Sequence, residues 1–108
     1  ELIYKGKVGS DISVEDGIEA ARLCVINIIA AVKTALEGDW SKLDSFVKLT
    51  GYVNCLDNFT DQPKIINGAS DMLVEIFGDQ GRHARVAVGS NALPLGIAVE
   101  IDAIVQLK

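Results

Sequence analysis

The sequence has few of the residues that mark metal, redox or disulfide chemistry. Its 108 residues include two cysteines, one histidine and six aromatic residues. Neither Cys24 nor Cys55 belongs to a CxxC pair or has a histidine at ligand spacing, so we predict no metal site. Free thiols of this kind are typical of a reducing compartment. We therefore expect a cytoplasmic protein without a bound cofactor.

The chain also lacks an excess of positive charge and a long apolar run. Its formal net charge is −5, and no cluster of Lys or Arg is present. Nucleic-acid binding requires such a cluster, and the aromatic residues form no stacking pattern. The longest strongly apolar stretch, 23–32, is shorter than the roughly 20 residues that span a bilayer. No signal-peptide pattern is visible. We expect neither a nucleic-acid nor a membrane partner.

Apolar residues make up 49% of the sequence, which is enough for the core of one domain over residues 1–108. A helix is predicted from Ser13, which precedes acidic residues in the first turn, to about Glu37, with Gly38 after its end. A second helix is predicted from an N-cap at Thr60 to residue 77. It has Pro63 in its first turn, where proline is tolerated.

Three further segments have the alternation of strands. They are residues 45–55, 83–89 and 99–105, and the last two flank a Gly/Ser/Asn/Pro turn and predict a hairpin. Residues 1–12 resemble a short strand or loop, so the order is (β)αβαββ. We expect an α+β fold with both helices on one face of the sheet. In the first strand we expect one core face and one mixed face. The core face would carry Val47, Leu49, Gly51, Val53 and Cys55. The mixed face would carry Phe46, Lys48, Thr50, Tyr52 and Asn54.

The two strands of the predicted hairpin carry one arginine and two carboxylates. Alternation places Arg85 on the same side of that hairpin as Glu100 and Asp102. A guanidinium beside carboxylates is an anchor for a small carboxylate ligand, because its planar fork binds that group in a bidentate way. The same three residues equally fit a cross-strand ion pair. Both interpretations stay open at this point.

The motifs around these charges resemble a known family. Arg85-Val-Ala-Val is followed by Leu93-Pro94, with the proline nine residues after the arginine, and then by the strand Val-Glu-Ile-Asp-Ala-Ile that contains Glu100. This pattern resembles the C-terminal signature of the Rid family, the YjgF-type reactive-intermediate deaminases, whose members often carry an endoribonuclease label. The segment 83–96, HARVAVGSNALPLG, is similar to a less characterised branch of this family.

The resemblance implies a chorismate-mutase-like α+β fold and a homotrimer whose clefts lie between subunits. That arrangement fits a three-stranded sheet whose second face we expect other subunits to bury. Family members begin with further strands ahead of the position of Glu1, so the resemblance implies that N-terminal strands are missing from this chain.

The resemblance also implies an activity, the hydrolysis of 2-imino or 2-enamino acids to 2-oxo acids and ammonia. Arg85 would bind the substrate carboxylate, and Glu100 would orient the attacking water. Ala87 stands where some deaminases carry a cysteine in the cleft, and Tyr52 is a further candidate for the cleft wall. The implied partner is a small carboxylate-bearing metabolite.

Two other functions remain open. One is a non-catalytic trimer that binds small carboxylates or has a regulatory role. The other is an endoribonuclease, which the acidic balance of the chain opposes. A pair of histidines for acid–base cleavage is impossible within one subunit, because His83 is the only histidine.

Overall fold

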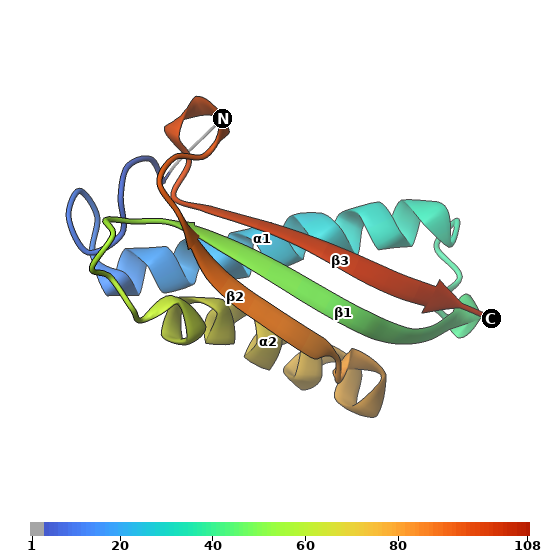
Figure 1. Cartoon of the computed structure of the whole chain (residues 1–108). Coiled ribbons are helices and arrows are strands. Elements are labelled where there is room, and N and C mark those ends of the chain that lie inside the picture. The colour runs from blue at the N-terminus through green and yellow to red at the C-terminus, as the bar shows by residue number, and fades with distance from the viewer. Residues whose placement is uncertain (1–3) are drawn as a thin grey trace.

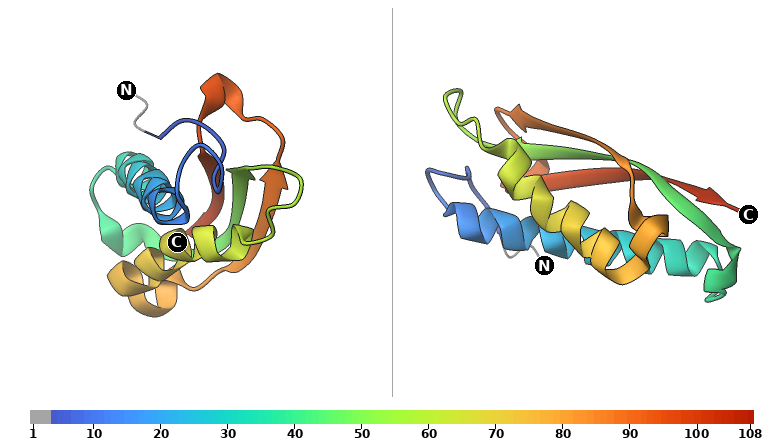
Figure 2. Two further views of the ribbon diagram at one scale, coloured as in Figure 1. Left: turned by 90° about the vertical axis from the view of Figure 1, so that its left-hand side faces the viewer. Right: turned by 90° about the horizontal axis from the view of Figure 1, so that it is seen from below.

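The protein has two layers, a three-stranded sheet and a pair of helices that cover one of its faces (Figures 1 and 2). The computed structural model describes residues 4–108, and residues 1–3 lie outside the described residues. The α+β class and the two-helix arrangement are confirmed. The helices are α1 (Val14–Ala35) and α2 (Gln62–Phe77), and the strands are β1 (Leu43–Asn54), β2 (Ala84–Ser90) and β3 (Val99–Leu107).

The helix boundaries follow the capping residues of the sequence. Ser13 caps α1, and its Oγ accepts a hydrogen bond from the Asp16 N–H at 3.0 Å. Helix α2 begins at Gln62, two residues after Thr60, which was the expected N-cap. Asp61 is the observed N-cap, and Pro63 lies in the first turn. It ends at Gly78, whose positive φ of 61° is accessible to glycine at little steric cost.

The predicted hairpin is wrong. The strand order is β2-β1-β3, so the two C-terminal strands lie on opposite sides of β1. Strand β2 pairs with β1 in parallel, and β3 pairs with β1 in antiparallel. The reason is helix α2, which connects β1 to β2. A strand–helix–strand segment returns the second strand parallel to the first, and the short turn after β2 carries the chain across the end of β1 (Figure 1).

The core lies between the sheet and the helices. Leu49 and Val53 of β1 are fully buried there, as are Ile65 and Ile66 of α2. Gly51 allows the close approach of these layers, because a Cβ at this position would lie 2.4 Å from Cδ1 of Ile66. At one end of the core the ring of Phe77 packs against Trp40 and Phe46.

One part of the predicted alternation in β1 is wrong. Phe46 was assigned to the mixed face and Val47 to the core face, but Phe46 is buried and Val47 is 41% exposed. The pairing of β1 with β3 shifts between Phe46 and Lys48, which marks a β-bulge. An extra residue at a bulge reverses the facing of the side chains before it. From Leu49 onward the predicted faces are the observed ones.

The second face of the sheet is open over much of its area. In the described chain, Val86 and Val88 of β2 are each 40% exposed, and Ile104 of β3 is 57% exposed. Residues 4–12 form isolated bridges with Ile97 and Cys55 and no continuous strand. No helix within residues 4–108 combines the length and the apolar character needed to cross a bilayer.

Candidate functional site

One row of side chains on strand β2 faces helix α2. Arg85 is paired with the buried Leu49, and Ala87 is paired with Gly51, which contacts α2. Side chains of paired residues share a face of the sheet, so this row lies on the helix side. Because β2 is an edge strand, the row is only partly covered, and Arg85 remains exposed while Ala87 is half-buried against the core.

Polar residues of α2 meet this row in two successive contacts. The Arg85 guanidinium donates a hydrogen bond to Oδ1 of Asn67. One helical turn further along α2, the Ser70 hydroxyl lies 2.9 Å from Nε2 of His83. Asn67 and Ser70 are three residues apart, so they share one side of α2.

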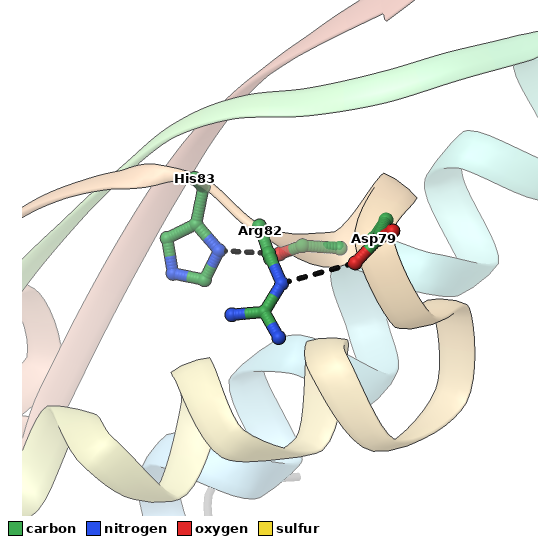
Figure 3. Close-up of polar contacts among 4 residues, drawn as sticks. Asp79, Arg82 and His83 are labelled. Carbon is green, nitrogen blue, oxygen red and sulfur yellow. Dashed lines mark hydrogen bonds and ion pairs between the residues drawn. The ribbon is translucent and has the colours of Figure 1, made fainter.

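The Ser70 contact and Arg85 border a shallow hollow of about 240 Å³ beside the start of β2. A second guanidinium, that of Arg82, lies on its rim and forms an exposed ion pair with Asp79 at 3.1 Å (Figure 3). An exposed pair of this kind contributes little to stability. The hollow is lined by Ser70, Asp71, Val74, Arg82, His83 and Arg85.

His83 is oriented by the backbone of the preceding turn. Its Nδ1 lies 2.6 Å from the carbonyl oxygen of Gly81, a contact drawn in Figure 3. A carbonyl oxygen can only accept, so Nδ1 carries a proton. Gly81 itself is tightly placed, since a Cβ there would lie 2.2 Å from the carbonyl oxygen of Leu73. The histidine is thus held by a turn whose backbone packs closely against α2.

The carboxylates that the sequence placed beside Arg85 lie elsewhere. Glu100 is paired with Tyr52, and Asp102 with Thr50, on the open face of the sheet. Arg85 is on the other face and on the other side of β1. The predicted ion pair therefore does not form within one chain. Of the predicted site residues, the structure brings Arg85 and Ala87 to one side of the sheet, and Tyr52 and Glu100 to the other.

A second hollow, of about 300 Å³, lies between α1 and the start of β3. Cys24 and Glu100 both line it, and the Cys24 thiol donates a hydrogen bond to the carbonyl oxygen of Val99 at 3.6 Å. Burial raises the pKa of the Cys24 thiol, and the negative charge of Glu100 raises it further. A thiol with a raised pKa is a poor nucleophile at neutral pH, so this cysteine is not an activated one.

Sequence reasoning missed Asn67 and Ser70. Both lie on α2 among residues that periodicity assigned to a helix, and nothing in the local pattern separates them from other exposed polar positions. The signal that was available is the order strand–helix–strand, which places α2 against β2 and hence opposite Arg85. Within residues 4–108, no group of three or more His, Cys, Asp or Glu side chains gathers as a metal site would require.

Comparison with known proteins agrees with this architecture. A curated relative, Protein TCP17 of Trypanosoma cruzi, is 44% identical over 104 residues, which are 95% of this chain and 64% of the relative. The chain therefore spans less than two thirds of that protein.

Two solved structures have the same fold. The protein Atu1372 of Agrobacterium tumefaciens, described as having unknown function, superimposes with a TM-score of 0.97 at 45% identity, over 100% of this chain and 68% of its own. A putative endoribonuclease of Shewanella oneidensis superimposes with a TM-score of 0.93 at 36% identity, over 99% and 70%. The profile of one family matches residues 1–106. The chain belongs to that family, described as YjgF/chorismate mutase-like, putative endoribonuclease.

Proposed function

We propose that this protein hydrolyses small 2-imino or 2-enamino acids to 2-oxo acids and ammonia, with Arg85 binding the substrate carboxylate. The observation that carries the proposal is the position of Arg85 on an edge strand, at the margin of a hollow. Asn67 Oδ1 is its one hydrogen-bond acceptor within residues 4–108. A guanidinium has five N–H donors, so most of them remain available to a ligand.

Hydrolysis of an imine depends more on the positioning of the substrate than on a strong acid or base. Water adds to the electrophilic imine carbon, the C–N bond breaks, and ammonia leaves. Fixing the carboxylate holds the neighbouring imine carbon at a defined place, which lowers the entropic part of the barrier. The positive charge of Arg85 also favours an anionic substrate over a neutral one.

Glu100 and Tyr52 take part in this proposal only through a second subunit. They lie on the opposite face of the sheet from Arg85 and are separated from it by β1. We therefore propose a homotrimer that associates through the open sheet faces and brings Glu100 of one subunit to the exposed edge of β2 in another, so that the site lies between subunits. The exposed apolar side chains of that face, Val86, Val88 and Ile104, support the association.

The test replaces Arg85 and follows ammonia release from imines that an amino-acid oxidase generates. Arg85→Ala should lose between about tenfold and hundredfold of the acceleration over the uncatalysed reaction, since it removes a charge-assisted hydrogen bond. Arg85→Lys keeps the charge without the planar fork and should retain part of the rate. Lys33→Ala, which removes an exposed charge from α1, is the matched control. Equal rates for all four proteins would refute the proposal.

Two other functions have distinct outcomes in the same experiments. A 2-oxo acid that raises the unfolding temperature of the wild type but not of Arg85→Ala, without any imine turnover, would indicate a non-catalytic carboxylate-binding protein. The family description favours a test of RNA cleavage as well. The net charge of −5 opposes binding to a phosphate backbone, so we expect no cleavage by purified protein.

A further inference from the structure

We infer that Ser70 and His83 form a proton relay for the ligand that Arg85 binds, with Ser70 contacting the attacking water and His83 accepting the proton through Ser70. This inference rests on the proposed function and assigns its acid–base step to residues of α2 and of the segment before β2. It also removes the need for Glu100 to reach the substrate.

The hydrogen-bond directions support a relay. Nδ1 of His83 donates to the Gly81 carbonyl oxygen at 2.6 Å, so in the neutral imidazole Nε2 carries a lone pair. Ser70 Oγ lies 2.9 Å from that nitrogen, and its hydroxyl is then the donor. The oxygen of Ser70 keeps its own lone pairs and can accept a hydrogen bond from water. The order water, Ser70, His83, Gly81 carbonyl is therefore consistent at every link.

The spacing of the two contacts suits a small ligand. His83 and Arg85 are two residues apart along an extended segment, which is about 6–7 Å. Ser70 and Asn67, their partners on α2, are separated by a little less than one turn, or about 5 Å. A carboxylate on Arg85 leaves room for the adjacent imine carbon and one water before the Ser70 hydroxyl. The hollow of about 240 Å³ is large enough for a molecule of a few heavy atoms.

The step balances without a further reactant. In the protonated imine, the water oxygen bonds to the imine carbon while the C=N electron pair moves to nitrogen. One water proton passes to Ser70 Oγ as the Ser70 proton passes to His83 Nε2. The relay then returns a proton to the nitrogen, the C–N bond breaks, and its electron pair leaves with ammonia. The remaining hydroxyl proton is released to solvent as the 2-oxo acid forms.

The charges around His83 come from two directions. Asp71 of α2 lines the same hollow, and Arg82 and Arg85 flank the histidine in sequence. Asp79 is paired with Arg82. The relay requires a neutral imidazole, because a protonated imidazole has no lone pair to accept the proton from Ser70; protonation of His83 should therefore stop the relay.

The alternative role for this pair is a tie that holds α2 to the segment before β2. A pH profile separates the two roles, because a tie would change stability without changing the form of the profile. We would measure kcat and KM from pH 5.5 to 9 for the wild type, Ser70→Ala, Ser70→Thr and His83→Gln. The imine would be supplied by an oxidase at graded flux, with the uncatalysed rate subtracted at each pH. Thermal unfolding would confirm that each variant is folded.

We expect kcat of the wild type to fall toward acid pH. Ser70→Ala and His83→Gln should lower kcat at neutral pH by about tenfold or more, with KM within twofold, and the fall toward acid should disappear. Ser70→Thr retains the hydroxyl and should recover most of the rate. In NMR spectra, 2-oxobutyrate should shift the His83 ring signals of the wild type but not of Arg85→Ala.

The results distinguish the relay from the proposed function. If the wild type accelerates hydrolysis and Arg85→Ala does not, while both relay variants keep the wild-type kcat and pH profile, the relay is overturned and the proposed function stands. A loss confined to KM also overturns it. If the wild type gives no acceleration, both proposals fall together.

Discussion

The two faces of the sheet differ in how completely one chain covers them. On the helix face, Leu49 and Val53 are fully buried under α1 and α2. On the open face, Val88 and Ile104 keep 40% and 57% of their surface exposed. The first face is a buried core with Arg85 at its exposed edge. The second face mixes exposed apolar side chains with the polar Tyr52 and Glu100, and no element of the described chain covers it. The contrast shows that the buried core of the single chain lies on the helix face, while apolar side chains of the open face stay exposed.

The largest effect should come from the helix face. Leu49→Ala should lower the free energy of unfolding by about 3 kcal/mol, because it leaves a cavity in a fully buried position. Ile104→Ala, on the open face, should cost less than about 1 kcal/mol, and only at concentrations where copies associate. Chemical denaturation of both variants at two protein concentrations measures the difference. Equal losses in the two variants would contradict the distinction between the faces.

A charge on the open face should change assembly and leave the fold intact. We expect the wild type to be a trimer in light scattering and Val88→Glu to dissociate into monomers, since the charge would be buried at the interface. Ile76→Glu is the matched control, because Ile76 is 56% exposed on α2, away from the sheet. A trimer that survives Val88→Glu but not Ile76→Glu would place the interface on the helices instead.

The smallest effect concerns Cys24 at the edge where α1 meets β3. Burial raises the pKa of its thiol, and Glu100 raises it further. Glu100→Gln removes that negative charge, so the pKa should fall and the thiolate fraction at pH 8 should rise. Alkylation of Cys24, followed by peptide mass spectrometry, should become faster by a factor of about three.

The control for this prediction is Asp102→Asn. It removes one charge from the same row of β3, two residues away, without touching a group that affects the Cys24 pKa. An alkylation rate that rises equally in both variants would mean that the overall charge of the protein, and not the proximity of Glu100, controls the thiol.

Much of the local structure could be predicted because it depends on neighbouring residues. Ser13 and Pro63 set the starts of the helices, and Gly78 ends the second one. The alternation in β3 also held, with Ile101 on the core side and Glu100 on the open side. Each of these features is fixed by capping, backbone restriction or the period of a strand.

The errors arose where pairing partners decide the outcome. The bulge between Phe46 and Lys48 turns the Phe46 side chain to the core face, and no pattern within β1 predicts that bulge. The hairpin was inferred from a turn-rich segment between two strands, although a helix-length connection before Arg85 favours parallel pairing of β2 with β1. The candidate site changed with that pairing, from Arg85 beside carboxylates to Arg85 beside Asn67.

The sequence by itself determined the type and chain order of the helices and strands, the net charge of −5 and the family signature that contains Arg85. Only the tertiary structure decided which residues share a site. Alternation gives the side of a strand to which a residue points, but the order of strands across a sheet depends on crossovers and on the burial of whole faces. For that reason Glu100 lies across β1 from Arg85, and Ser70 and His83 take the place beside it.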